Sequence, residues 1–226
     1  PRGKPQLKDG LMEPDAVADD AALYYNFVLK AAGGGDMDIF RRTGLTFACV
    51  LLPPLKIGAE YIKTHGHYHP NMAGTTLAYP EVYTHYSGTL YLLMHRRANG
   101  DPARLDDCVI YEMQPGRSIN IPPGYLHVLI NPSDEPALMA GLYSVDSYPQ
   151  YDPVIQMRGA AYYFVESGGA MKAVANPRYA VCPPLVTLGD LSGSAFEPPC
   201  GEAPLWSSFL SKPDAYAMLF DPAAAE

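Results

Sequence analysis

The stretch GRSINIPPGYLHVLIN, residues 116–131, carries the most specific pattern in this chain. It places Gly116, Pro122, Gly124, His127 and Asn131 at the spacing G-x5-P-x-G-x2-H-x3-N. Pro-Pro-Gly favours a tight turn, and the apolar run that follows it favours a strand. The pattern therefore predicts a turn that leads directly into a strand carrying His127.

A second motif lies upstream, in the segment THGHYH at residues 64–69, which holds three of the six histidines of the chain. Its H-x-H pair is His67 and His69, and Glu81 follows before the pattern around His127 begins. Together the two motifs resemble those of the cupin superfamily, whose members are small double-stranded β-barrels built along a jelly-roll path. The resemblance implies an all-β fold with few short helices.

The same resemblance implies a metal ion in each subunit, because in cupins the residues that match His67, His69, Glu81 and His127 are the metal ligands. Residues two apart on a strand share a face, so the two histidines of H-x-H would point into the barrel together. Three neutral imidazoles and one carboxylate suit a divalent transition metal. Iron, manganese or nickel is favoured and zinc is possible, since a tetrahedral ion would leave no open position beside four protein ligands.

The remaining sequence is typical of an all-β domain. The chain has 226 residues, of which 48% are hydrophobic and 18% charged, with 17 tyrosines and 23 prolines. Short strand-like segments separated by turn residues predict a sandwich or barrel. These segments are 23–30, 46–52, 59–69, 81–86, 89–97, 108–113, 117–121, 125–131, 137–144, 162–166 and 171–175. A short helix is predicted within 15–23 and a flexible loop at 31–36.

The two ends of the chain differ in character. Residues 1–179 are predicted to form the barrel with an N-terminal arm. Residues 180–226 are rich in Pro and Ala, contain the only tryptophan, Trp206, and show no clear period. We expect them to form an extension that packs on the barrel or on a partner subunit. Because cupins commonly pair through an exposed sheet edge, we expect a homodimer.

Charge and composition argue against several classes of protein. The formal net charge is −8 and no basic stripe appears, which argues against binding to nucleic acid. No apolar run approaches the roughly 18 residues of a membrane span, and no signal peptide opens the chain, so the predicted compartment is the cytoplasm. Cys49 and Cys108 lie in apolar runs and are predicted to be buried, reduced thiols. His65 and His95 are predicted to be non-ligands, with His95 solvated.

One family of cupins matches several further segments. KTHGHYHP (63–70), YPEVY (79–83), IPPGYLH (121–127), INPSDEPALMAGLYSVD (130–146) and NPRY (176–179) resemble cupin-type glucose-6-phosphate isomerase, over about residues 20–179. This resemblance implies that glucose 6-phosphate and fructose 6-phosphate are interconverted through an enediol, in glycolysis and gluconeogenesis. Glu81 would be a ligand, the general base, or both, and a hydride shift is the competing mechanism.

The resemblance also implies how the sugar phosphate is held. In the family, a threonine and a glycine just ahead of the histidines, together with tyrosines of the barrel, contact the substrate. The matching residues here are Thr64, Gly66, Tyr24, Tyr83, Tyr143 and Tyr151. Core packing is the alternative role for each tyrosine, and Thr64 could instead satisfy backbone groups.

One histidine of the family has no counterpart, because its place falls here around Pro149. His85 shares the inward strand face with Glu81 and Tyr83, and these three are the predicted catalytic residues. His85 is either a proton relay or a hydrogen-bonded histidine of the barrel wall. Other open assignments are a different cupin sugar isomerase, a cupin dioxygenase and a non-enzymatic cupin that binds metal or sugar.

Overall fold

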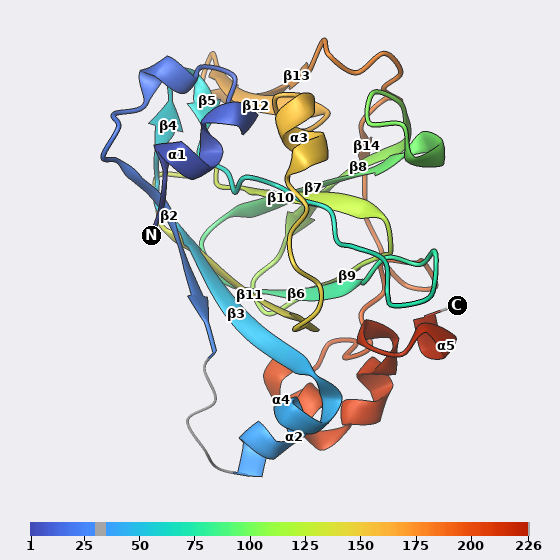
Figure 1. Ribbon diagram of the computed structural model, residues 1–226. Helices are drawn as coiled ribbons and strands as arrows, with labels where there is room; N and C mark the ends of the chain where they lie inside the picture. The colour runs from blue at the N-terminus through green and yellow to red at the C-terminus, as the bar shows by residue number, and fades with distance from the viewer. Residues whose placement is uncertain (30–34, 226) are drawn as a thin grey trace.

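Two β-sheets face each other in the computed structural model, which describes residues 1–29 and 35–225 (Figure 1). The first sheet has the strand order β1-β2-β3-β11-β6-β9 and the second β10-β7-β8-β14. The strands of the first sheet are β1 (Arg2–Gly3), β2 (Ala22–Val28), β3 (Leu45–Leu52), β6 (Glu81–Ser87), β9 (Ser118–Ile121) and β11 (Ala137–Ser144). Those of the second are β7 (Leu90–Arg97), β8 (Leu105–Met113), β10 (Tyr125–Ile130) and β14 (Val186–Thr187).

The chain passes from one sheet to the other after β6, β8, β9 and β10, which is the path of a jelly-roll barrel. Gly88 makes the first of these crossings with a φ of 82°, and a Cβ at this position would lie 2.5 Å from the carbonyl oxygen of Pro136. Only glycine fits such a turn without strain. The predicted all-β cupin barrel is therefore confirmed.

Alternate residues of the strands fill the space between the two sheets, as the two-residue period of a strand requires. The largest apolar cluster joins side chains of both sheets, among them Leu52, Leu92, Met94, Ile119, Ile121 and Leu129. Four members of this cluster are 0% exposed and come from three different strands: Leu52 from β3, Leu92 and Met94 from β7, and Ile119 from β9. This shared core holds the two sheets at a fixed spacing and so fixes β6, which carries Glu81, and β10, which carries His127.

A third sheet covers the outer face of the second sheet at the top of Figure 1, whereas the N-terminal arm packs into the main core cluster through Leu7 and Leu11. The sheet has the order β13-β12-β5-β4, and its strands are β4 (Lys56–Ile57), β5 (Glu60–Tyr61), β12 (Tyr162–Ser167) and β13 (Ala170–Ala175). Val154 of α3 (Asp152–Gln156) and Phe164 of β12 pack against the outward residues of β10. The N-terminal arm consists of α1 (Lys4–Leu7), η1 (Lys8–Gly10) and η2 (Pro14–Ala16). A separate short helix, η3 (Ala98–Gly100), connects β7 to β8.

Helices cover part of the outer face of the first sheet at the bottom of Figure 1. They are α2 (Gly35–Thr43), α4 (Leu205–Ser211), η4 (Pro213–Leu219) and α5 (Pro222–Ala225). The ring of Trp206 lies 5.4 Å from that of Phe40 in α2 and 5.2 Å from that of Phe47 in β3. Residues after 180 therefore pack on the same chain through this aromatic cluster.

The local predictions failed in three places. Residues 59–69 do not form one strand: β5 covers only Glu60–Tyr61, isolated bridges follow at Lys63, His67 and Tyr68, and Gly66 interrupts the extended backbone with a φ of 78°. The helix expected within 15–23 is wrong, since the chain forms η2 and then enters β2 at Ala22. The loop expected at 31–36 lies largely outside the described residues, but Gly35 and Asp36 belong to α2, which was not predicted.

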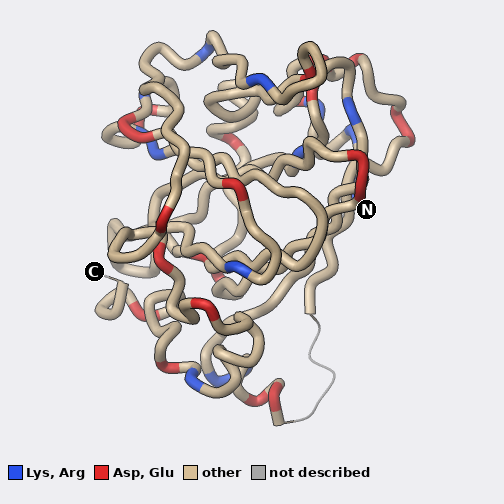
Figure 2. The backbone as a smooth tube through the Cα atoms, turned by 180° about the vertical axis from the view of Figure 1, so that it is seen from behind, with Lys and Arg blue, Asp and Glu red and all other residues tan. Residues whose placement is uncertain are grey.

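Residues with positively and negatively charged side chains are distributed along the whole fold, as the view from behind shows (Figure 2). All four cysteines are free thiols; Cys108 is buried as predicted, whereas Cys49 is only half-buried. Among residues 1–29 and 35–225, the longest helices fall short of the length and apolar character that crossing a membrane requires.

Candidate metal centre and its cavity

Four side chains bring their nitrogen and oxygen donors together inside the barrel. One donor atom from each of His67, His69, Glu81 and His127 lies within 4.8 Å of every other. The Nε2 atoms of His67 and His69 are 3.2 Å apart, and Oε2 of Glu81 lies 3.4 Å from Nε2 of His127 and 3.5 Å from Nε2 of His69. The four residues predicted as ligands therefore converge on one point.

The two sequence motifs position this group through the backbone. Gly124, with a φ of 81°, turns the chain into β10, which carries His127. An isolated antiparallel bridge places His67 opposite His127, whose N–H donates to the carbonyl oxygen of His67 over 3.3 Å. Glu81 is the first residue of β6 and enters from the facing sheet.

Hydrogen bonds to backbone carbonyls orient two of the rings. Nδ1 of His69 lies 2.9 Å from the carbonyl oxygen of Tyr79, and Nδ1 of His127 lies 3.4 Å from that of Tyr125. Because a carbonyl oxygen only accepts, Nδ1 carries the proton in both rings and Nε2 presents its lone pair to the group. Nε2 of His127 is buried and has no hydrogen-bond partner among the described residues. This unpaired nitrogen, together with the inward-facing Nε2 atoms of His67 and His69 and the carboxyl group of Glu81, fits a transition-metal ion.

Burial also sets the protonation states of the group. Burial lowers the pKa of His69 and of His127 to about 4, and it lowers the pKa of His67 well below its ordinary value. The rings are therefore neutral at pH 7, as metal ligands must be, and their contacts with Glu81 are not ion pairs. Burial raises the pKa of Glu81 to about 7, against the smaller opposing effects of His69 and the Tyr83 hydroxyl.

Two glycines make room for the site, and the sequence alone identified only one of them. A Cβ on Gly66 would lie 2.5 Å from Cγ2 of Val128, and its φ of 78° adds backbone strain for any other residue. Gly141 on β11 faces Glu81: a Cβ there would lie 2.5 Å from Oε1 of Glu81 and 2.9 Å from the ring of Tyr83. Gly66 was predicted as a substrate contact, whereas nothing in the local pattern around Gly141 pointed to the site.

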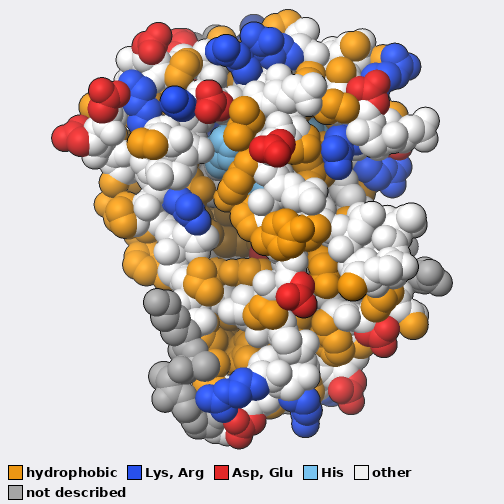
Figure 3. Space-filling view, viewed as in Figure 1, with side chains coloured by type: hydrophobic (Ala, Val, Ile, Leu, Met, Phe, Trp, Pro, Cys, Tyr) orange, Lys and Arg blue, Asp and Glu red, His pale blue; other side chains and the backbone are white. Residues whose placement is uncertain are grey.

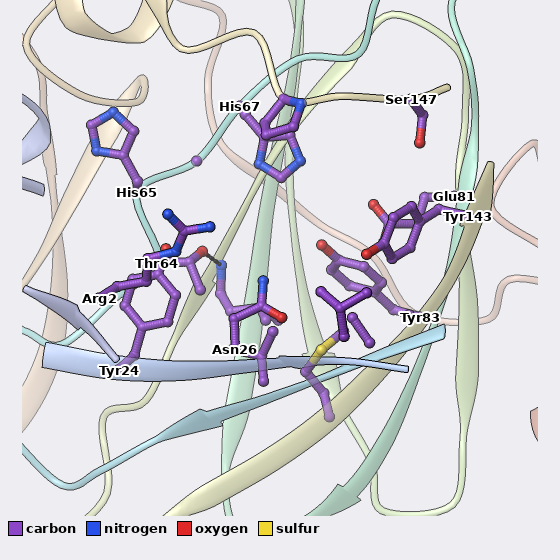
Figure 4. Close-up of a pocket in the computed structure, with 18 of the residues that line it drawn as sticks. Arg2, Tyr24, Asn26, Thr64, His65, His67, Glu81, Tyr83, Tyr143 and Ser147 are labelled. Atoms are coloured by element: carbon purple, nitrogen blue, oxygen red, sulfur yellow. Dashed lines mark hydrogen bonds between the residues drawn. The ribbon is translucent and has the colours of Figure 1, made fainter. Parts of the chain in front are cut away.

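A cavity of about 240 Å³ adjoins this donor group. His67, His69 and Glu81 belong to its wall, and all six predicted substrate contacts line it: Tyr24, Thr64, Gly66, Tyr83, Tyr143 and Tyr151. Figure 3 shows histidine side chains through an opening on the face viewed in Figure 1, bordered by hydrophobic side chains. In the close-up of Figure 4, Glu81, Tyr83 and Tyr143 lie on one side of the cavity and Arg2, Tyr24 and Thr64 on the other.

The tyrosines of this cavity are neutral hydrogen-bonding groups. Burial raises the pKa of Tyr24 and of Tyr143 to about 12, and raises the pKa of Tyr83 well above its ordinary value. Each phenol therefore keeps its proton at pH 7 and can donate it to a ligand oxygen. The hydroxyl of Thr64 accepts the backbone N–H of Leu129 at 3.0 Å, so this residue also has a structural role.

The other histidines differ from their predictions in part. His85 is fully buried, its Nε2 lies 2.9 Å from the carbonyl oxygen of Ser87, and it is not among the residues lining the cavity. The structure thus unites Glu81 and Tyr83 but does not bring His85 to them. The prediction that His95 is solvated is wrong, because His95 is fully buried and lies 3.1 Å from the Tyr68 hydroxyl. The metal-ligand group does not include His65, which lines the cavity instead.

Sequence reasoning missed part of the cavity wall. The lining also contains Arg2, Asn26, Val28, Ala48, Val50, His65, Leu129, Met139, Gly141, Ser147 and Pro149. Most of these residues occupy inward positions of β2, β3 and β11, which the alternation of those strands could have identified. Arg2 had no such signal, because it precedes every recognisable motif.

Comparison with known proteins now gives the family. The family model described as Glucose-6-phosphate isomerase (GPI) matches residues 8–180, more than half of the chain. The chain belongs to this family. The glucose-6-phosphate isomerase of Pyrococcus abyssi is 30% identical over 135 residues, which cover 60% of this chain and 65% of that protein. The enzyme of Thermococcus litoralis is 29% identical over 135 residues, covering 60% and 64%.

These matches extend over just under two thirds of the length of the family members compared. Two solved structures show weaker similarity to this glucose-6-phosphate isomerase family member. Oxalate oxidase in complex with the substrate analogue glycolate has a TM-score of 0.41 and 16% identity, covering 56% of this chain and 53% of that one. Oxalate decarboxylase of Bacillus subtilis has a TM-score of 0.39 and 18% identity, covering 57% and 28%.

Proposed function

We propose that this chain is a metal-dependent aldose–ketose isomerase that interconverts glucose 6-phosphate and fructose 6-phosphate. The observation that carries the proposal is the convergence of His67, His69, Glu81 and His127 beside a cavity lined by neutral tyrosines. Membership of the glucose-6-phosphate isomerase family supports the choice of substrate. A dioxygenase could use the same donors, but the family match favours the isomerase.

The four donors would hold one divalent transition metal, with iron, manganese or nickel before zinc. When bound, the ion would supply a Lewis acid for the negative charge that develops on O1 and O2 of the substrate. Three neutral rings and one carboxylate carry a single negative charge, which would neutralise only part of the charge of a divalent cation and leave it able to attract the substrate oxygens.

We assign the proton transfer to Glu81. Its carboxyl group would take the proton from C2 and return it to C1, and a pKa near neutrality suits a group that must both accept and release a proton. Tyr83 would orient this carboxyl group, because its hydroxyl favours the ionised form of Glu81. Thr64, Gly66, Tyr24, Tyr143 and Tyr151 would hold the substrate.

The test is a metal-dependent assay. Purified protein is stripped with a chelator, reloaded separately with Fe²⁺, Mn²⁺, Ni²⁺ or Zn²⁺, and assayed with fructose 6-phosphate by coupled detection of glucose 6-phosphate. We expect the stripped protein to be inactive and at least one metal to restore turnover. Running the reaction in deuterated water separates the mechanisms, because proton transfer incorporates solvent deuterium and a hydride shift does not. A protein that binds metal but turns over neither phosphosugar would contradict the proposal.

A substitution of His85 tests whether this residue takes part in proton transfer together with Glu81. The sequence left two roles open for His85, a hydrogen-bonded histidine of the barrel wall or a proton relay, and a relay would contribute about 10²–10⁴-fold to kcat. Its side chain bonds to Ser87 and does not line the cavity. We therefore expect His85→Phe to leave metal content unchanged and to lower kcat by less than about tenfold. A loss within the larger range, with an unchanged melting temperature, would restore the relay.

We propose that the protein forms a homodimer through the outer face of the first sheet. Phe27 is 58% exposed and Tyr86 45%, although both belong to strands of this sheet. Phe27 pairs with half-buried Cys49 on β3, and Cys49 lies close enough to Tyr86 to add to the rise that burial causes in the pKa of the Tyr86 phenol. Exposed apolar residues grouped on one sheet face are typical of interfaces. Light scattering at micromolar concentration should give the mass of two chains, and a monomer would contradict this assignment.

A further inference from the structure

The N-terminal arm places one cationic side chain at the wall of the cavity. Arg2 is the only Lys or Arg among the described residues that line it. In Figure 4 its guanidinium lies beside Thr64 and Tyr24, across the cavity from Glu81 and Tyr143. The cavity therefore has two ends of different chemistry, with the donor group at one and a fixed positive charge at the other.

The backbone around Arg2 is well anchored. Arg2 pairs with Tyr24 in the ladder between β1 and β2, so its Cα position is set by the first sheet. Two residues on, Nζ of Lys4 donates to the carbonyl oxygen of Val17 at 2.8 Å and lies 2.9 Å from the carboxylate of Asp19. Leu7 is buried in the main core cluster. These contacts hold the arm against the barrel and keep Arg2 at the cavity.

The guanidinium itself makes no ion pair with any carboxylate among residues 1–29 and 35–225. This distinguishes it from Arg96, Arg41 and Arg117, each of which pairs with an acidic side chain. Its charge is nevertheless felt in the cavity. Burial raises the pKa of Tyr151, and the charge of Arg2 opposes this rise. A half-buried, unpaired guanidinium beside neutral phenols is a site for an anion.

We propose that Arg2 binds the phosphoryl group of the substrate and so makes the enzyme selective for phosphorylated over unphosphorylated sugars. A guanidinium can donate two parallel hydrogen bonds to phosphate oxygens, and the phenols of Tyr24 and Tyr151 are placed to add more. The identity of the sugar rests on the proposed function, whereas the preference for a phosphoryl group rests on Arg2 alone. Arg2 would bind the phosphoryl end and take no part in the proton transfer at C1 and C2.

The experiment measures binding without catalysis. Glucitol 6-phosphate, an open-chain phosphosugar that cannot isomerise, and glucitol are titrated into the metal-loaded protein by calorimetry. Wild type is compared with Arg2→Gln and Arg2→Lys. Arg41→Gln is the matched control, because Arg41 is an exposed arginine of α2 that pairs with Asp38 at 2.5 Å.

We expect Arg2→Gln to weaken the binding of glucitol 6-phosphate by about 10- to 100-fold. Arg2→Lys should recover part of this loss, since a lysine keeps the charge but not the two-pronged geometry. Arg41→Gln should bind as wild type, and metal content should be unchanged in every variant. In the assay, Arg2→Gln should raise KM for fructose 6-phosphate and leave kcat within a few-fold.

The outcomes separate this inference from the proposed function. If wild type binds glucitol 6-phosphate through Arg2 but does not isomerise fructose 6-phosphate, the isomerase assignment fails and the anion site stands. If wild type isomerises the substrate and Arg2→Gln binds glucitol 6-phosphate with unchanged affinity, the role of Arg2 is refuted. Equal binding of glucitol and glucitol 6-phosphate by wild type would refute it as well.

Discussion

Glu81→Gln should lower kcat for fructose 6-phosphate by about 10²–10⁴-fold at a saturating concentration of metal. The amide keeps the size of the side chain but cannot carry a proton between C2 and C1. Glu81 is only 5% exposed, lines the cavity, and has its pKa raised to about 7 by burial, which is why we assign the proton transfer to this carboxyl group. The measurement is kcat across a metal titration, with bound metal determined by elemental analysis.

The metal titration distinguishes the two proposed roles of Glu81: a role as ligand changes the metal concentration needed for saturation, and a role as proton carrier changes kcat at saturation. If the carboxylate is also a ligand, Glu81→Gln should need more metal to reach saturation, because three imidazoles remain to hold the ion. Glu112→Gln is a matched control, since Glu112 is an exposed carboxylate on β8. If Glu81→Gln keeps kcat within tenfold of wild type once metal is saturating, the proton is carried by another group.

The metal group could be predicted because its members belong to short, regular motifs. Turn residues before β10 fix His127, and the strand period fixes which residues around Glu81 face inward. These rules are local, so they hold whatever the rest of the chain does. His67 and His69 converge with them as expected, even though their segment is not a continuous strand, since isolated bridges still place His67 opposite His127.

Other features could not be predicted because they depend on contacts between distant segments. Arg2 reaches the cavity only through its pairing with Tyr24. His95 follows an apolar run and precedes two arginines, which suggested exposure, yet Tyr68 and Tyr179 pack against its ring and bury it. α2 has only one fully buried large apolar residue, Phe40, and forms because the C-terminal segment supplies Phe209 and Trp206 to cover it. A sequence pattern within one segment does not indicate which distant segment will pack against it.

Gly141 also depends on a distant contact, because its neighbours at the site, Glu81 and Tyr83, lie on another strand. Gly141→Ala should weaken metal binding or lower kcat/KM by about 10- to 100-fold, the range typical of residues that position metal ligands. The new Cβ would lie 2.5 Å from Oε1 of Glu81, which is closer than any real contact. The carboxyl end of Glu81 must move, and the ring of Tyr83 at 2.9 Å must move with it.

The fold itself should tolerate Gly141→Ala, because the nearest atom is the free end of a side chain and alanine lowers the entropy cost of a strand residue by roughly 0.5–1 kcal/mol relative to glycine. We therefore expect a melting temperature close to wild type together with a shifted metal titration. Gly189→Ala is the matched control, since a Cβ on Gly189 meets no atom within 4 Å. If Gly141→Ala binds metal and turns over substrate as wild type does, the carboxyl group of Glu81 has room to move without consequence. The packing of the Glu81 carboxyl group against β11 would then not be required for metal binding or turnover.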